Sequence, residues 1–319
     1  MTALWALVVI VNKRVLAYVD PLAVNFFARI ASIAGLLLIT VPLTALQLWD
    51  NGFGINAAAA VWMALAAVST WLIAFSAYYY ALRGARVAVV APILSTDPLW
   101  TALFAWLILG ATFGALTLAG MVVAMAGVLL ITRWMATGDE AGAGALAGAA
   151  RGHVLPGSPA AGSAAALQTG RLRLIALAVL AAAGWGLGPV FIDEASTAYG
   201  KPTATMMIMS QALGMLMLGA VLIARRRPLA ARPLTRLERR RAAVLLAVGG
   251  LLEAGVSVLF FLAIVEIGPV LTMLIMATTP VFAIAFGVAF LRERVGLRPM
   301  LAAVVTVVGV MLAAIDGVS

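Results

Sequence analysis

Two carboxylates lie within long apolar stretches of the sequence. Asp97 belongs to the stretch 86–109, and Glu253 belongs to the stretch 242–266. A charged side chain at the centre of a bilayer costs about 2.5–3.5 kcal/mol on insertion scales, so its presence needs a reason. A carboxylate in apolar surroundings can bind and release protons in the working pH range. The two acids therefore predict either proton-coupled transport or a structural acid paired with Arg29 or a backbone donor.

The residues next to these acids favour open space around them. Pro98 removes a backbone donor and frees a carbonyl one turn earlier, which opens a helix locally. Gly249, Gly250 and Gly255 flank Glu253, and small residues let a neighbouring helix or a substrate approach closely. Both acids are thus candidates for binding substrate or protons.

Aromatic residues gather in the stretch 57–82. Trp71, Phe75 and Tyr78 recur at helical spacing and lie on one face. An aromatic wall beside an acid suits amphipathic or cationic substrates. For Tyr79 and its neighbour Tyr80, an aromatic belt at the membrane interface is the favoured alternative.

Candidates from the second part of the chain are an amide and a glycine-rich surface. Gln211 lies in the middle of the stretch 203–224, near methionines that we expect to face lipid. Gly184 and Gly188 precede Pro189, a pattern typical of close helix packing followed by a kink. A hinge and simple tight packing are equally compatible with that pattern.

Composition restricts the class of protein. Of 319 residues, 65% are hydrophobic and 10% are charged, whereas a soluble domain is usually about 45–50% apolar and about 25% charged. A soluble globular enzyme is excluded. The sequence holds no Cys and a single His, His153, so we expect no disulfide, catalytic residue, metal site or cofactor.

Ten apolar runs predict ten spanning helices of an all-α integral membrane protein. Residues 135–172, rich in Ala, Gly, Ser and Pro, predict a flexible cytoplasmic linker between two five-helix units, 1–134 and 173–319. The second unit contains an arginine-rich loop at 225–241. The runs are 2–19, 22–46, 57–82, 86–109, 114–134, 173–197, 203–224, 242–266, 268–291 and 297–315.

An internal repeat relates the two units. A shift of 182 positions places Pro98 on Pro280, and the same shift aligns Gly114 with Gly296 and Trp71 with Glu253. Five helices is an odd number, so the second unit must cross the membrane in the opposite sense. Inverted repeats are typical of transporters that work by alternating access. Pro98 and Pro280 are therefore hinge or gate candidates.

Charge placement fits this inversion. Lys13 lies near the end of the first helix, and Asp193 and Glu194 lie at the corresponding place in the sixth. These residues are candidate gates, and the alternative is that they are topology signals that snorkel to the interface.

Basic residues also predict the orientation. The third, fifth, seventh and ninth loops carry the arginines, whereas the even loops carry Lys201 alone. Cytoplasmic loops are enriched in Lys and Arg, so both termini are predicted outside a plasma membrane. The loop 225–241 is interpreted as such an anchor, with a patch for anionic lipid or nucleic acid as the alternative. We expect lipids but no nucleic acid as partners.

The paired segments beginning APILSTDPLW and GPVLTMLIMA resemble the two EamA domains of the drug/metabolite transporter superfamily. Pro98 and Pro280 match the family's mid-helix proline, and Glu293 matches its acidic turn, although Ala111 replaces the acid in the first half. The resemblance implies a ten-helix inner-membrane permease that exports metabolites, amino acids or toxic compounds. Family members are commonly drawn with cytoplasmic termini, opposite to the charge bias here.

The favoured function is secondary active export of a small molecule, with protons as candidate coupling ion. An importer of the same fold and a membrane-embedded lipid-modifying enzyme are the alternatives. The enzyme needs a polar site at the membrane surface, and the sequence holds no His/Asp/Glu cluster. A pump driven by ATP is excluded because no nucleotide-binding loop is present. Substrate identity and oligomeric state do not follow from the sequence.

Overall fold

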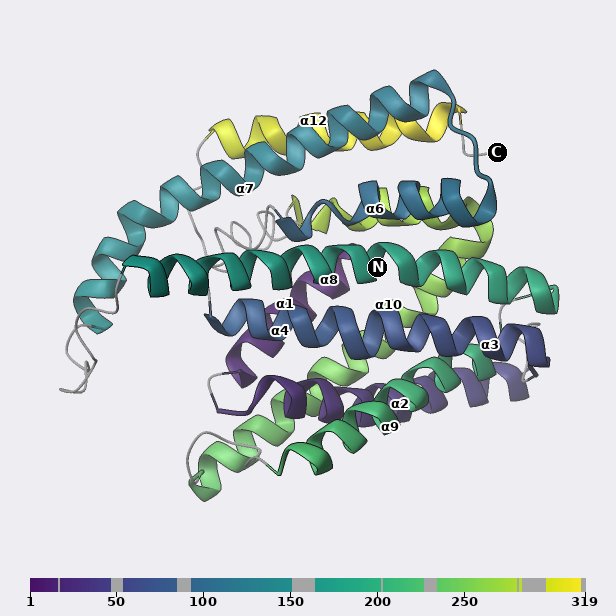
Figure 1. The fold of residues 1–319 in the computed structure, drawn as a ribbon, viewed down its shortest axis with the longest axis horizontal. Helices are drawn as coiled ribbons and strands as arrows, with labels where there is room; N and C mark the ends of the chain where they lie inside the picture. Colours follow the sequence, from purple (N-terminus) through teal and green to yellow (C-terminus); the bar gives the residue numbers. More distant parts are fainter. Residues whose placement is uncertain are drawn as a thin grey trace.

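The computed structural model describes residues 1–16, 18–46, 54–84, 93–150, 164–201, 203–226, 234–279, 281–282 and 297–316. These residues form helices joined by short turns (Figure 1). The helices are α1 Thr2–Val15, α2 Pro21–Ala45, α3 Ala57–Ala66, the π-helix η1 Ala67–Ala74, α4 Phe75–Gly84, α6 Asp97–Phe104, the π-helix η2 Ala105–Leu109, α7 Ala115–Ala150, α8 Ala164–Tyr199, α9 Ala204–Arg225, α10 Arg236–Met276 and α12 Leu297–Asp316.

Five helices among the described residues are long and apolar enough to cross a membrane. The all-helical prediction is therefore confirmed. Four shorter apolar helices lie on other predicted runs: Thr2–Asn12, Asp97–Leu109, Ala115–Ile131 and Met300–Ile315. The five longer ones are Pro21–Ala45, Ala57–Ala81, Leu172–Tyr199, Ala204–Arg225 and Arg236–Met276.

Helix α10 combines parts of two predicted runs. It continues to Met276 through Gly268, whose φ of 78° and ψ of 164° are not helical. Only glycine adopts this backbone conformation without strain, and Pro269 follows it directly. The break at Gly268 separates two helical segments at the boundary predicted between the runs 242–266 and 268–291.

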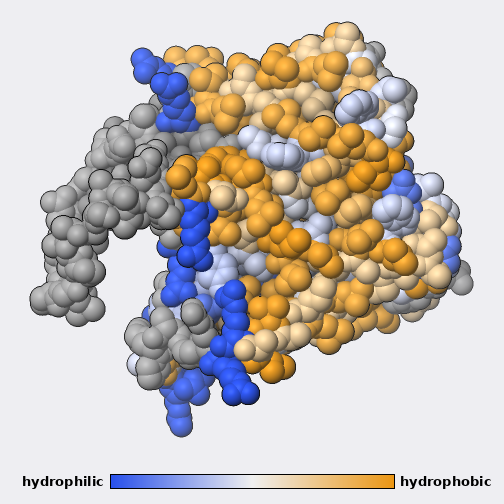
Figure 2. All heavy atoms as spheres, viewed as in Figure 1, coloured by the Kyte–Doolittle hydropathy of each residue, from blue (hydrophilic) through white to orange (hydrophobic). Residues whose placement is uncertain are grey.

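The surface is that of a protein surrounded by lipid. Large apolar side chains such as Leu38 and Ile223 are 69% and 79% exposed. Hydrophobic residues cover most of the face shown in Figure 2, and hydrophilic residues gather mainly toward one end of it. Contiguous apolar surface of this extent is unfavourable in water and favourable in a bilayer.

Helix starts are fixed by side-chain caps. The Asp20 carboxylate accepts a hydrogen bond from the Leu22 amide at 3.0 Å, at the start of α2. Thr203 and Asn56 cap α9 and α3 in the same way. Thr235 forms a reciprocal capping box at the start of α10. Such caps satisfy amide groups that have no partner within the helix.

Helices α7 and α12 lie side by side along one edge of the molecule (Figure 1). Glycines make this contact close. A Cβ atom on Gly127 would lie 2.6 Å from the Thr306 amide nitrogen, and one on Gly309 would lie 2.6 Å from the Ala124 Cα. Neither position has room for a side chain.

The structure differs from the predicted linker. Helix α7 continues to Ala150 and α8 begins at Ala164, so most of 135–172 is helical. Alanine has the highest intrinsic helix propensity, and its abundance in this segment outweighs the glycines. Residues 151–163 lie outside the described part.

Candidate functional site

Asp97 lies at a break in its membrane segment. Residues 95–96 form a turn, and α6 begins at Asp97 with Pro98 in its first turn. This agrees with the expectation that Pro98 opens the helix. A carboxylate in a first turn lies near amide groups that lack helical partners, and the positive end of the helix dipole stabilises it. Pro280 lies outside the described residues, but a turn at 277–278 precedes it at the equivalent place.

A widened segment positions Trp71. Helix α3 runs into the π-helix η1, which carries Trp71 and leads into α4. Single π-turns inside α-helices are frequent at functional sites. Asn25 Nδ2 donates a hydrogen bond of 2.7 Å to the Trp71 carbonyl oxygen. The backbone is therefore held from α2 at the widened turn.

The glycine surface of α8 packs against η1. A Cβ on Gly184 would lie 2.8 Å from the Ser69 carbonyl oxygen and 2.9 Å from the Ala74 Cβ. Gly188 faces the Thr70 side chain with no room for a Cβ. These contacts show tight packing, one of the two interpretations of the pattern.

Arg29 is the centre of a buried polar network. Its side chain is fully buried in α2 and forms an ion pair with Glu253 of α10. Arg29 Nη1 donates to Gln211 Oε1 at 3.3 Å, and Gln211 Nε2 donates to Ser257 Oγ at 3.1 Å. A buried charge is tolerated when it is paired and hydrogen-bonded. Glu253 thus has the partner that the sequence suggested. Gln211, which belongs to α9, connects that helix to the ion pair through Arg29.

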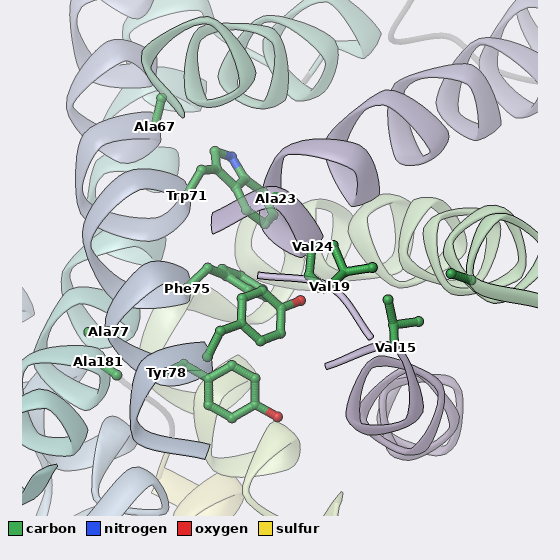
Figure 3. Close-up of a cluster of buried hydrophobic side chains, with 12 residues drawn as sticks. Val15, Val19, Ala23, Val24, Ala67, Trp71, Phe75, Ala77, Tyr78 and Ala181 are labelled. Atoms are coloured by element: carbon green, nitrogen blue, oxygen red, sulfur yellow. The ribbon is translucent and has the colours of Figure 1, made fainter. Parts of the chain in front are cut away.

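The same guanidinium group covers aromatic rings. Arg29 Cζ lies 4.0 Å from the Trp71 ring centroid and 5.1 Å from that of Phe75. The two rings are stacked with centroids 5.0 Å apart. Figure 3 shows Trp71, Phe75 and Tyr78 in succession along one face of their helix, as predicted. Cation–π attraction adds to the ion pair in fixing Arg29.

A cavity of about 120 Å³ brings both acids together. Tyr78 does not line it, and instead packs against Trp185 with ring centroids 4.9 Å apart. Gln211 does not line it either, and is connected to its lining through Ser257 and, by way of Arg29, through Glu253. The lining residues are Trp5, Ala66, Thr70, Trp71, Phe75, Asp97, Trp185, Pro189, Ile192, Ser210, Glu253, Val256, Ser257, Phe260, Phe261, Met273 and Met276.

The two acids differ in their partners. Glu253 has Arg29, whereas no Lys, Arg or His of the described residues pairs with Asp97. The carboxyl oxygen Glu253 Oε2 and the hydroxyl oxygen Thr70 Oγ1 are buried and have no hydrogen-bond partner in this part of the chain. Both residues line the cavity, and these two oxygens are covered by neighbouring protein atoms.

The charged gate candidates of α8 do not line this cavity. Asp193 and Glu194 are half-buried on α8, and neither lines it. Lys13 belongs to α1, but its side chain lies outside the described part. Their role as gates stays a prediction.

Two sequence interpretations were wrong about burial. Tyr79 is fully buried rather than interfacial, and its hydroxyl accepts a 2.9 Å hydrogen bond from Asn12 Nδ2. Met206 and Met207 are fully buried in the core rather than facing lipid. Asn12, a polar residue inside an apolar run, was the available signal for the first of these contacts.

Metal chemistry has no support among the described residues, where no three His, Cys, Asp or Glu side chains gather. Trp185 and Thr70 are further lining residues that sequence reasoning did not select. Trp185 lies 180 positions after Trp5, and their ring centroids are 6.3 Å apart.

Comparisons with known proteins identify a family and a fold. The EamA-like transporter family matches residues 1–133 and 172–315. A search of the curated proteins gave no match. Among solved structures, one titled "Crystal structure of protein" is similar at a TM-score of 0.65 and 15% identity, over 98% of this chain and 93% of that one. At that identity the likeness shows the fold alone.

Proposed function

Since the chain belongs to the EamA-like transporter family, we propose that it exports small metabolites, amino acids or drugs by alternating access. The observation that carries this proposal is a cavity that collects two carboxylates and several aromatic rings from helices of both halves of the sequence. An apolar pocket with a few converging polar groups is the usual form of a small-molecule site.

The proposed architecture is ten helices in two inverted repeats, residues 1–134 and 173–319. Arg29 and Gln211 occupy equivalent positions, 182 residues apart, and hydrogen-bond to each other. Direct contact between equivalent residues is expected on a two-fold axis. An axis through Arg29 and Gln211 would place the cavity beside the point about which the halves rock.

Reciprocal contacts between α7 and α12 support the same symmetry. Gly127 packs on Thr306, and Gly309 packs on Ala124. Adding 182 to 124 and to 127 gives 306 and 309, so one contact becomes the other when the repeats are exchanged. Such reciprocity is characteristic of a two-fold relation, and inverted repeats provide it in transporters.

The proposed coupling uses Asp97 as proton carrier. Asp97 lines the cavity without a basic partner in the described region, so its charge depends on the proton or the ligand. Glu253 can exchange its proton only by weakening its ion pair with Arg29, which makes it the second candidate. Export would follow when a proton from outside replaces the substrate at the acid.

A resistance screen tests the function. Cells overexpressing the protein are exposed to metabolites and drugs, and accumulation of each protective compound is measured. We expect lower intracellular accumulation with the protein than with an empty vector, and loss of that difference with Glu253→Gln. Higher accumulation of the same compound would indicate import and contradict the proposed direction.

Orientation in the plasma membrane is part of the proposal. The charge bias places both termini outside, with the arginine-rich loop 225–241 in the cytoplasm. A reporter active only in the cytoplasm, fused after residue 319, should be inactive. An active fusion would reverse the orientation without affecting the transport proposal.

A further inference from the structure

We propose that the cavity binds primary arylalkylammonium ions, that is, amines with one aromatic ring on a short alkyl chain. This inference deepens the proposed function and rests on it, because it names the substrate class of the same cavity. It depends on three properties of the cavity: its charge, its free hydrogen-bonding atoms and the size of its aromatic surface.

Charge favours a cation. Asp97 and Glu253 are the ionisable residues that line the cavity in the described structure. The charge of Glu253 is balanced by Arg29, which lies behind it and does not line the cavity. Asp97 has no such partner, so an ionised Asp97 leaves one uncompensated negative charge. A bound cation would supply the missing partner.

Free polar atoms favour a ligand with N–H donors. Glu253 Oε2 and Thr70 Oγ1 are buried without partners among the described residues, and both can accept hydrogen bonds. Leaving such atoms unsatisfied is costly. A primary ammonium group has three donors: one for Asp97, which lines the cavity, and two for these oxygens once a side-chain movement uncovers them. Arg29 Nε also lacks a partner, but Arg29 is not a lining residue.

Aromatic walls favour a ring beside the ammonium group. The ring centroids of Trp5 and Phe75 are 5.8 Å apart, and those of Phe75 and Trp185 are 5.3 Å apart. Both pairs meet nearly at right angles, an arrangement that leaves ring faces and edges available to a further ring. The cation–π contact of Arg29 with Trp71 shows that this aromatic cluster accommodates a positive charge.

Size restricts the aromatic part. The cavity measures about 120 Å³, and an apolar cavity of about 150 Å³ holds a benzene molecule. Because 120 Å³ is the smaller of the two volumes, one ring is the most that the cavity encloses, and fused polycyclic systems do not fit. The same two carboxylates disfavour carboxylate ligands, so zwitterionic aromatic amino acids should bind more weakly than the corresponding amines.

Binding to the purified full-length protein in detergent tests the inference. The probe is 2-phenylethylamine, followed by calorimetry or by tryptophan fluorescence, since Trp5, Trp71 and Trp185 line the cavity. The comparison ligands are 3-phenylpropionate, 2-phenylethanol and phenylalanine. We expect the amine to bind at least about tenfold more tightly than each of them, because 2-phenylethanol and 3-phenylpropionate lack the ammonium group and phenylalanine adds a carboxylate that the two acids repel.

Two variants and a control localise the binding. Asp97→Asn should weaken amine binding about tenfold and leave 2-phenylethanol unaffected. Thr70→Val, which is close to isosteric, should weaken amine binding by a smaller factor. This variant tests the inference if Asp97→Asn does not fold. Glu266→Gln removes an exposed acid of α10 outside the cavity and should change nothing. Equal binding of phenylalanine or 3-phenylpropionate, or unchanged amine binding in both variants, would overturn the inference.

The binding assay separates this inference from the transport proposal. Amine binding without any flux in vesicles would support the inference and contradict the proposed function. Conversely, export of another class of compound, with no amine binding, would support the function and contradict the inference.

Discussion

Under the proposed two-fold repeat, the α7–α12 contact and the Arg29 network each join equivalent positions of the two halves, but their residues have diverged to different extents. At α7–α12 the equivalent residues Gly127 and Gly309 are identical, and both make close backbone contacts. In the network the equivalents differ: Arg29 faces Gln211, and Trp71 is the counterpart of Glu253. The residue types thus follow the proposed symmetry where α7 and α12 pack, and depart from it in the buried polar network.

The physical reason lies in what each contact requires. Close helix packing in lipid depends on small residues that let backbones approach, whichever half supplies them. A buried ion pair needs one cation and one anion, so identical residues at both equivalents would place like charges together. Different residues at the two equivalent positions of the proposed repeat resolve that conflict.

The largest expected effect comes from breaking the ion pair. Arg29→Gln leaves Glu253 ionised or protonated in an apolar site without its partner, and removing one member of a buried pair costs about 3–5 kcal/mol. Thermal unfolding of the purified protein should show this loss, whereas Arg29→Met with Glu253→Leu should lose less. A double variant as unstable as Arg29→Gln would show that packing, rather than charge, dominates at this position.

Exchanging Arg29 and Gln211 tests whether these two positions are equivalent across the proposed axis. In Arg29→Gln combined with Gln211→Arg, the arginine stands at the equivalent position and remains close to Glu253. The double variant should recover part of the stability lost in Arg29→Gln, as measured by the same unfolding experiment. Additive losses from the two substitutions would contradict an axis between these residues.

The reciprocal contact between α7 and α12 predicts that substitutions at its two glycines lower stability by similar amounts. Gly127→Val and Gly309→Val each force a side chain against a facing backbone, and overpacking of this kind costs about 1–3 kcal/mol. The two variants should be destabilised by similar amounts, with Val122→Leu on the exposed surface of α7 as a neutral control. Strongly unequal losses would argue against the reciprocal relation.

The smallest effect is expected at a surface pair outside both regions. Arg83 and Asp20 form an ion pair of 3.4 Å with side chains 43% and 28% exposed. Solvent screening limits such pairs to about 0–1 kcal/mol. Arg83→Gln should therefore leave the unfolding temperature nearly unchanged, and a loss comparable to that of Arg29→Gln would contradict the contrast between buried and exposed pairs.

Much of the fold could be predicted because apolar run length alone identifies membrane helices. The association of Trp71 with Glu253 was also predictable, since the repeat places them at equivalent positions. The helical continuation of α7 to Ala150 was not predicted, because glycine and alanine in one segment give opposite local preferences. The contact of Arg29 with the Trp71 ring was not predicted either. It depends on the π-helical backbone that carries Trp71, and no sequence pattern indicates a π-helix.

Burial was the least predictable property of the site. Tyr79 and Met206 have sequence environments that fit lipid contact as well as protein contact, because both surroundings are apolar. Only the tertiary arrangement decides between them. The Asn12 side chain that bonds to Tyr79 comes from a helix 67 residues earlier, a separation at which local patterns carry no information.

The most direct measurement is proton flux coupled to substrate in proteoliposomes. With a compound identified in the resistance screen and a pH gradient imposed, the account predicts substrate-dependent proton movement that Asp97→Asn abolishes and Glu266→Gln preserves. Undiminished, still pH-dependent transport by Asp97→Asn would contradict the central claim that the unpaired acid of the cavity carries the coupling proton.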